Sequence, residues 1–168
     1  MKLFNIPIIG KINQSCLTAL YKVENNTPES IWKGIKGIYS TDEKSHICGT
    51  YIESDKEGKS SLNFILTYKD KSIEKISLCE QTLPIIIISS GNFKDEYNFA
   101  FNLLHEVGHH NGCNQEWKAH KFASQYVNIN SGIYCKKEHH TFVGGKEGSK
   151  KFFKKLKRQH IMHGLSIY

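Results

Sequence analysis

Long hydrophobic runs are missing from this sequence of 168 residues, and its first apolar stretch, LFNIPIIG, is too short to cross a bilayer. Pro7 interrupts that stretch, and Lys11 follows it in place of the small residues that mark a signal-peptide cleavage site. We therefore expect a cytoplasmic protein without a membrane segment. Internal repeats, low-complexity segments and dividing linkers are also missing, so a single domain over residues 1–168 is expected.

Paired cysteine motifs are missing as well. The five cysteines are an odd number with wide, irregular spacing and no CxxC pair; they are Cys16, Cys48, Cys79, Cys113 and Cys135. This pattern argues against a disulfide framework and against a structural zinc ribbon. A thiolate can bind zinc, but the position of Cys113 in a turn favours a free residue there. The hydrophobic content of 39% and charged content of 23% are ordinary for a globular chain, so disorder is not indicated.

Residues 105–109 are His-Glu-Val-Gly-His, an HExxH motif. The motif can bind a metal only if it is helical, because a helix directs residues i and i+4 to one side. Asn92 can cap such a helix, with Asp95 three residues later. Apolar residues recur at helical steps of three and four; they are Phe93, Tyr97, Ala100, Phe101, Leu104 and Val107. A helix over residues 93–110 is therefore predicted.

Two histidines one helical turn apart can hold one zinc ion, and the glutamate between them reaches a water at the metal. His105 and His109 are therefore predicted zinc ligands, and Glu106 is the predicted general base of a hydrolytic site. A catalytic zinc ion needs a third protein ligand and one open position.

The third ligand is expected on a second helix that follows the turn signal Asn111-Gly112 and runs to residues 130–132. Glu116 falls in its first turn. His120, four residues later on the same face, is the alternative ligand, or else a side chain that supports a ligand without touching the metal. The metzincin pattern is disfavoured, because its third histidine would fall at Gln115.

The run from Pro84 to Tyr126 resembles the ImmA/IrrE group of gluzincin metallopeptidases. Members have a strand, a helix ending in HELGH and a second helix with a glutamate, an alanine and a Phe-Ala pair. The second-helix features here are Glu116, Ala119, Phe122 and Ala123. The resemblance implies a zincin-like fold in which Glu116 is the third zinc ligand. It also implies site-specific cleavage of a regulatory, repressor-like protein.

Four segments before the motif are rich in β-branched and aromatic residues; they are 46–53, 62–68, 73–78 and 84–89. A short helix is expected over 30–38, and an exposed hairpin loop over 55–61. Strands followed by helices predict an α+β fold, in which a small mixed or antiparallel sheet packs against the HExxH helix and the second ligand-bearing helix. Residues 84–90 are the nearest strand that could pair with an extended substrate.

Residues 147–163 are predicted to form a basic C-terminal helix, to which part of the net charge of +7 belongs. This charge favours an acidic surface on a protein or peptide substrate. Binding to nucleic acid is the less favoured reading, because no nucleic-acid module is recognisable. The alternative function is a catalytically degenerate zinc-binding module that uses this helix to engage nucleic acid or a protein. The candidate donors to an oxyanion are Tyr126, Tyr134, His139 and His140.

Overall fold

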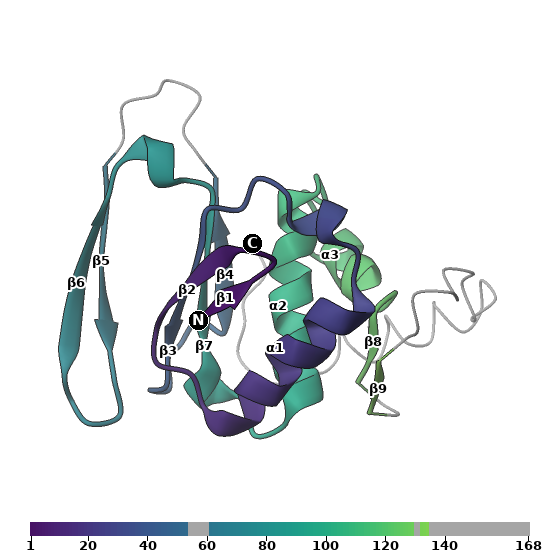
Figure 1. Cartoon of the computed structure of the whole chain (residues 1–168), viewed down its shortest axis with the longest axis horizontal. Coiled ribbons are helices and arrows are strands. Elements are labelled where there is room, and N and C mark those ends of the chain that lie inside the picture. The colour runs from purple at the N-terminus through teal and green to yellow at the C-terminus, as the bar shows by residue number, and fades with distance from the viewer. Residues whose placement is uncertain (54–60, 130–131, 135–168) are drawn as a thin grey trace. The chain divides into compact units, whose positions relative to one another are not determined.

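The computed structural model describes residues 1–53, 61–129 and 132–134, all of which belong to one unit of the chain, Met1–Lys137. Its main sheet has five strands in the order β1-β2-β3-β7-β4 (Figure 1). Strands β2, β3 and β7 run parallel, and β1 and β4 are antiparallel to their neighbours. The strand bounds are β1 Lys2–Leu3, β2 Ile6–Gly10, β3 Gly37–Thr41, β4 Gly49–Ile52 and β7 Ile85–Ser89. The prediction of an α+β fold is confirmed, and of the two kinds of sheet that were expected, mixed or antiparallel, the main sheet is mixed.

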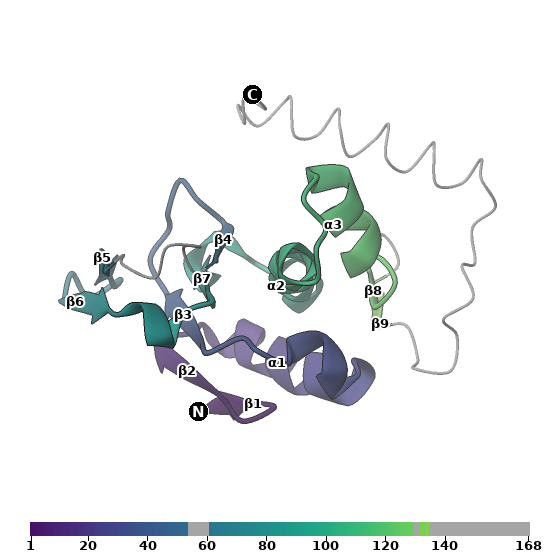
Figure 2. The same cartoon turned by 90° about the horizontal axis from the view of Figure 1, so that it is seen from above.

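Three α-helices lie among the described residues: α1 (Gln14–Asn26), α2 (Glu96–His110) and α3 (Glu116–Ala123). Helix α2 lies between α1 and α3 (Figure 2). Most of its apolar stripe is buried, and so is every residue of β3, the central parallel strand. The central members of this core are Val23, Ile38, Ile86, Ile88, Phe99, Leu103, Leu104 and Val107. None of the helices in the described ranges has the length and apolar character needed to span a bilayer.

The HExxH helix ends at His110 as predicted, but it begins at Glu96, three residues later than predicted. The predicted cap at Asn92 is wrong, because the Asn92 side chain instead makes hydrogen bonds of 2.9 and 2.8 Å to the backbone of Ser45. Asp95 is the cap, and its carboxylate accepts a hydrogen bond from the backbone N–H of Asn98. A negative side chain at this end also suits the helix dipole.

The predicted extent of the second helix is wrong beyond Ala123. Residues Val127–Asn128 form a short strand, β8, which pairs with β9 (Ile133–Tyr134). The helix predicted over residues 30–38 is wrong: the structure has a 3₁₀ helix, Glu29–Trp32, and β3 begins at Gly37. Gly34, with φ +103, lies between them in a conformation that no right-handed helix contains. Helix α1 was not anticipated, although its buried residues Cys16, Ala19, Leu20 and Val23 have helical spacing.

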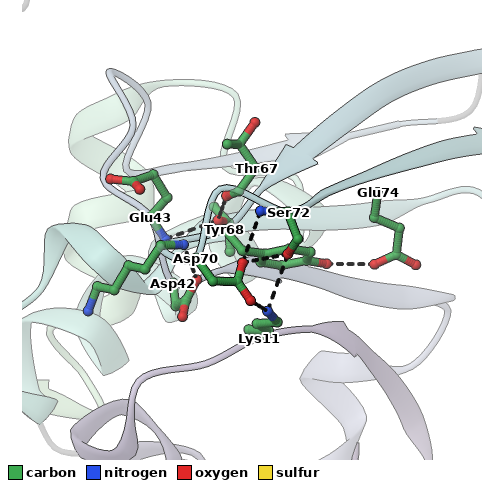
Figure 3. A network of polar contacts seen from close by, with 10 residues as sticks. Lys11, Asp42, Glu43, Thr67, Tyr68, Asp70, Ser72 and Glu74 are labelled. Atoms are coloured by element: carbon green, nitrogen blue, oxygen red, sulfur yellow. Dashed lines mark hydrogen bonds and ion pairs between the residues drawn. The ribbon is translucent and has the colours of Figure 1, made fainter.

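Strands β5 (Leu62–Thr67) and β6 (Ile73–Leu78) form a hairpin close to the predicted bounds. The hairpin covers the side of the main sheet away from α2 (Figures 1 and 2). Figure 3 shows one attachment of its turn, the ion pair of Asp70 with Lys11. The backbone N–H of Lys69 also donates to Asp42 at 3.0 Å. The Tyr68 hydroxyl donates to Glu74 at 2.6 Å within the hairpin. Most of the loop predicted over 55–61, and the helix predicted over 147–163, lie outside the described residues.

Candidate metal centre

Helix α2 directs His105 and His109 to one point, as their four-residue spacing predicts. Their Nε2 atoms are 3.0 Å apart, and the two rings are nearly perpendicular. His105 is only 7% exposed, because the helix turn that carries it is buried on nearly every side. The two imidazoles are therefore held close together by the packing of α2.

A short connection after α2 returns the chain to the side of the helix that carries His105 and His109. Gly112 has φ +83, and the backbone N–H groups of Gly112 and Cys113 donate to the carbonyl groups of His109 and Gly108. This is the glycine-terminated helix end that the Asn-Gly pair predicts. Gly108 then lets α3 approach closely, since an added Cβ would lie 3.1 Å from the Cα of Ala119.

Glu116 begins α3 and completes a group of three possible metal ligands with His105 and His109. Its carboxylate oxygens lie 3.0 Å from Nε2 of His105 and 3.4 Å from Nε2 of His109. The hydrogen bond with His105, followed by the charges of the surrounding histidines, lowers the pKa of Glu116 to about 2. Ligands about 2.1 Å from a tetrahedral ion are about 3.4 Å apart, so this spacing and donor set suit one metal ion.

Neighbouring groups orient the two imidazoles differently. Nδ1 of His109 lies 2.8 Å from the carbonyl oxygen of Cys113, so Nδ1 carries the hydrogen and Nε2 is left as the donor atom for a metal. Nδ1 of His105 is buried and has no hydrogen-bond partner in the described part of the chain. The ring of His120 packs edge-on against His105, with centroids 4.4 Å apart. His120 thus contacts a candidate ligand but is outside the group of three.

Glu106 lies against Gly49 of β4 and outside the group of three ligands, and it is 7% exposed. Burial is the main cause that raises its pKa to about 7. Glu116 raises it further, whereas His105 and the backbone N–H of Tyr51 favour the charged form. Gly49 permits this arrangement, because an added Cβ there would lie 3.0 Å from the Glu106 carboxylate.

A cavity of about 480 Å³ opens beside these groups, with walls from β4, α2 and the start of α3. Its lining residues are Gly49, Thr50, Tyr51, Glu53, His105, Glu106, His109, Asn114 and Glu116. Sequence reasoning missed the β4 residues and Asn114. No local signal marks them, because β4 reaches α2 only through sheet pairing. The larger cavity, of about 600 Å³, contains none of the candidate ligands.

Two predictions about the surroundings of the site are wrong. Strand β7, which was expected to offer a free edge, is internal, and β4 is the edge strand next to the site. Tyr126 and Tyr134, the described members of the predicted oxyanion donors, do not line the cavity. Tyr134 packs against Tyr97, near the opposite end of α2. His139 and His140 lie outside the described residues.

We expect Glu106→Gln to stabilise the metal-free protein at pH 8 relative to wild type, and to have little effect at pH 4. Between pH 4.5 and 7 the unfolded chain has lost the Glu106 proton while the folded chain retains it, so wild-type stability falls as the pH rises through this window. Glutamine removes that penalty, which is about 3 kcal/mol at most. Urea unfolding of chelator-treated protein at several pH values measures the difference. A difference that does not grow between pH 5 and pH 8 would contradict the buried environment of Glu106.

Comparisons with protein-family models, with curated proteins and with solved structures found no match to this chain. A function must therefore be inferred from the geometry of the site, in which His105, His109 and Glu116 could hold a metal ion.

Proposed function

We propose that this protein is a zinc-dependent metalloendopeptidase of the HExxH type, with a zincin-like active site. His105, His109 and Glu116 would hold the ion, and Glu106 would be the general base. One observation carries the proposal: the buried Glu106 carboxylate lines the same cavity as the three ligands without being one of them. A structural zinc site closes with a fourth protein ligand and has no use for such a carboxylate.

The choice of zinc rests on the donor atoms. Two imidazole nitrogens and one carboxylate match the three-ligand sets of catalytic zinc, whereas calcium and magnesium prefer oxygen ligands only. The described residues near the group supply no fourth histidine or cysteine ligand. That leaves room for water or substrate on the cavity side.

Peptide hydrolysis at this site would divide between the bound metal ion and Glu106. A bound zinc ion would supply Lewis-acid chemistry, polarising a scissile carbonyl and making water more acidic. Glu106 would accept a proton from the attacking water and later donate it to the leaving amine. Its position at the cavity wall, with a pKa near 7 in the metal-free protein, suits a group that must do both.

Within the described ranges β4 has no partner on the edge opposite β7, and this supports an extended peptide as substrate. The backbone N–H of Ser89 bonds to the carbonyl of Cys48, so the alternation of antiparallel pairing turns the backbone groups of Gly49 and Tyr51 away from β7. The Tyr51 N–H is bonded to Glu106, so the groups left at the cavity to pair with a substrate strand are the backbone groups of Gly49 and the carbonyl of Tyr51.

We further propose a regulatory, repressor-like target in the cytoplasm, on the basis of the resemblance to ImmA/IrrE peptidases. The distribution of charge bears on how such a target would be attracted. Residues 1–134 contain fourteen basic and fourteen acidic residues, whereas residues 135–168 contain nine basic and two acidic residues. Attraction to an acidic surface would therefore arise from 135–168. The same asymmetry is the observation that favours the second candidate function, a zinc-binding module that engages nucleic acid or a partner protein.

The test is to incubate the wild-type protein and Glu106→Gln with lysate of the source cell and to compare new peptide termini by mass spectrometry. We expect one or a few cleavages that require Glu106, because a folded target presents few extended segments to the site. Many scattered cuts would indicate a degradative enzyme instead of a regulatory one. If no cut depends on Glu106, the peptidase proposal fails and the binding module is favoured.

A further inference from the structure

Tyr51 of β4 contacts α2 at His110, in addition to the contact of β4 with Glu106. It is half-buried and lines the cavity. Its hydroxyl oxygen lies 3.1 Å from Nδ1 of His110, and the two rings pack edge to face with centroids 5.5 Å apart. His110 follows the metal-binding motif directly, so this contact reaches the last turn of α2.

The direction of this hydrogen bond follows from the other side of the His110 ring. Nε2 of His110 lies 3.0 Å from the carbonyl oxygen of Lys33, which can only accept. Nε2 therefore carries the hydrogen, and Nδ1 of the neutral ring accepts from the Tyr51 hydroxyl. The side chain of the next residue, Asn111, donates to the carbonyl of Ile31 at 2.8 Å, in the same segment as Lys33. His110 is thus fixed in place by the segment before β3.

This direction decides what Tyr51 can do in the cavity. The only hydrogen of its hydroxyl is directed to His110, so the hydroxyl is not available as a donor to an oxyanion. Burial, followed by the charge of Glu53, also raises the pKa of Tyr51, so the hydroxyl stays neutral. The hydroxyl therefore serves as an attachment to α2.

The main chain of Tyr51 makes the other attachment. Its backbone N–H stabilises the Glu106 carboxylate, and Gly49 lies against the same carboxylate on the same strand. Glu106 and His110 are four residues apart and share one face of α2. Tyr51 therefore spans two successive turns of the helix, with its main chain at Glu106 and its side chain at His110.

We propose that Tyr51 and His110 are a positioning pair, which holds the edge of β4 and the Glu106 carboxylate in register with the metal-binding turn of α2. Neither residue is a metal ligand or a proton carrier in this scheme. The effect on catalysis rests on the proposed peptidase function, but the effect on the placement of β4 does not.

The test uses the full-length protein and the variants Tyr51→Phe, His110→Leu and the double variant, with His110→Gln as the conservative replacement. The first readout is amide hydrogen exchange at residue 51, measured by NMR, which needs no substrate. We expect exchange there to be about tenfold faster in Tyr51→Phe and His110→Leu, with helix α1 unaffected. His110→Gln should restore much of the protection, since glutamine can both accept and donate a hydrogen bond. Tyr21→Phe, which removes an exposed hydroxyl on α1, is the matched control and should change nothing.

The second readout is the kinetics of cleavage of a peptide substrate by zinc-loaded protein. Each single variant should lower kcat about tenfold with zinc content unchanged. The kcat of the double variant should be no lower than that of the less active single variant, because both changes remove the same hydrogen bond. Additive losses, unchanged exchange at residue 51, or exchange that also rises in α1 would overturn the pair. A loss in Tyr51→Phe as large as in Glu106→Gln, with unchanged exchange, would overturn it in favour of a catalytic tyrosine. If the wild-type protein cleaves nothing, the peptidase proposal fails, while the exchange experiment still decides the positioning pair.

Discussion

Glu106→Gln is expected to lower peptide cleavage by about 10³-fold and to leave the zinc content unchanged, because glutamine cannot accept the proton of the attacking water. Glutamine has nearly the same shape as glutamate, so the cavity wall formed with Gly49 should be kept. Metal binding should also be kept, since Glu106 is not one of the three ligands. The measurements are kcat on a cleaved peptide and elemental analysis of the purified variant.

A control separates this effect from a general loss of negative charge. Glu29→Gln makes the same chemical change on an exposed residue of the 3₁₀ helix and should have no effect on either measurement. Loss of zinc in Glu106→Gln would mean that the glutamate binds the metal. Unchanged turnover would mean that another group accepts the proton. Either result would overturn the role given to Glu106.

Replacement of a metal ligand is expected to produce the second large effect. His105→Ala and His109→Ala should each leave the protein without measurable zinc, and Glu116→Ala should weaken zinc binding by more than about 100-fold. His120→Ala should weaken binding by about tenfold, because this side chain packs against His105 and lies outside the ligand group. Competition with a chromogenic chelator measures all four affinities.

His46→Ala is the matched control, because His46 is an exposed histidine of the loop before β4. It should bind zinc as the wild type does. If His120→Ala abolishes binding and Glu116→Ala does not, the site has three histidine ligands and the gluzincin assignment is wrong. Zinc retained by both His105→Ala and His109→Ala would exclude the proposed centre altogether.

Short-range patterns predicted the helical end of the site well, for a physical reason. The apolar stripe of α2 and the glycine at residue 112 act within a few residues, and the structure places His105, His109 and Glu116 together as that local reading requires. The start of α2 was predicted less well. Two polar residues compete for the capping role there, and only the contact of Asn92 with Ser45, far away in the sequence, decides the outcome.

The pairing of strands could not be predicted in the same way. The four predicted strand segments correspond to β4, β5, β6 and β7, because β-branched and aromatic residues cluster in them. How these strands pair depends on contacts between distant segments. The misplaced edge illustrates this limit. Strand β7 follows the other predicted strands and is the last strand before α2. It nevertheless pairs with β3 along one edge and with β4 along the other.

The sequence by itself determined that His105, Glu106 and His109 lie close together on one helix, since their spacing is set by helical geometry alone. It also determined the α+β class, through the periods of its apolar residues. Only the tertiary structure decided the surroundings of that chemistry. It placed β4 against α2, buried Glu106 beside Gly49 and joined Tyr51 to His110. Those contacts join residues more than fifty positions apart, and no local preference encodes them, because they exist only once the sheet and helices have packed.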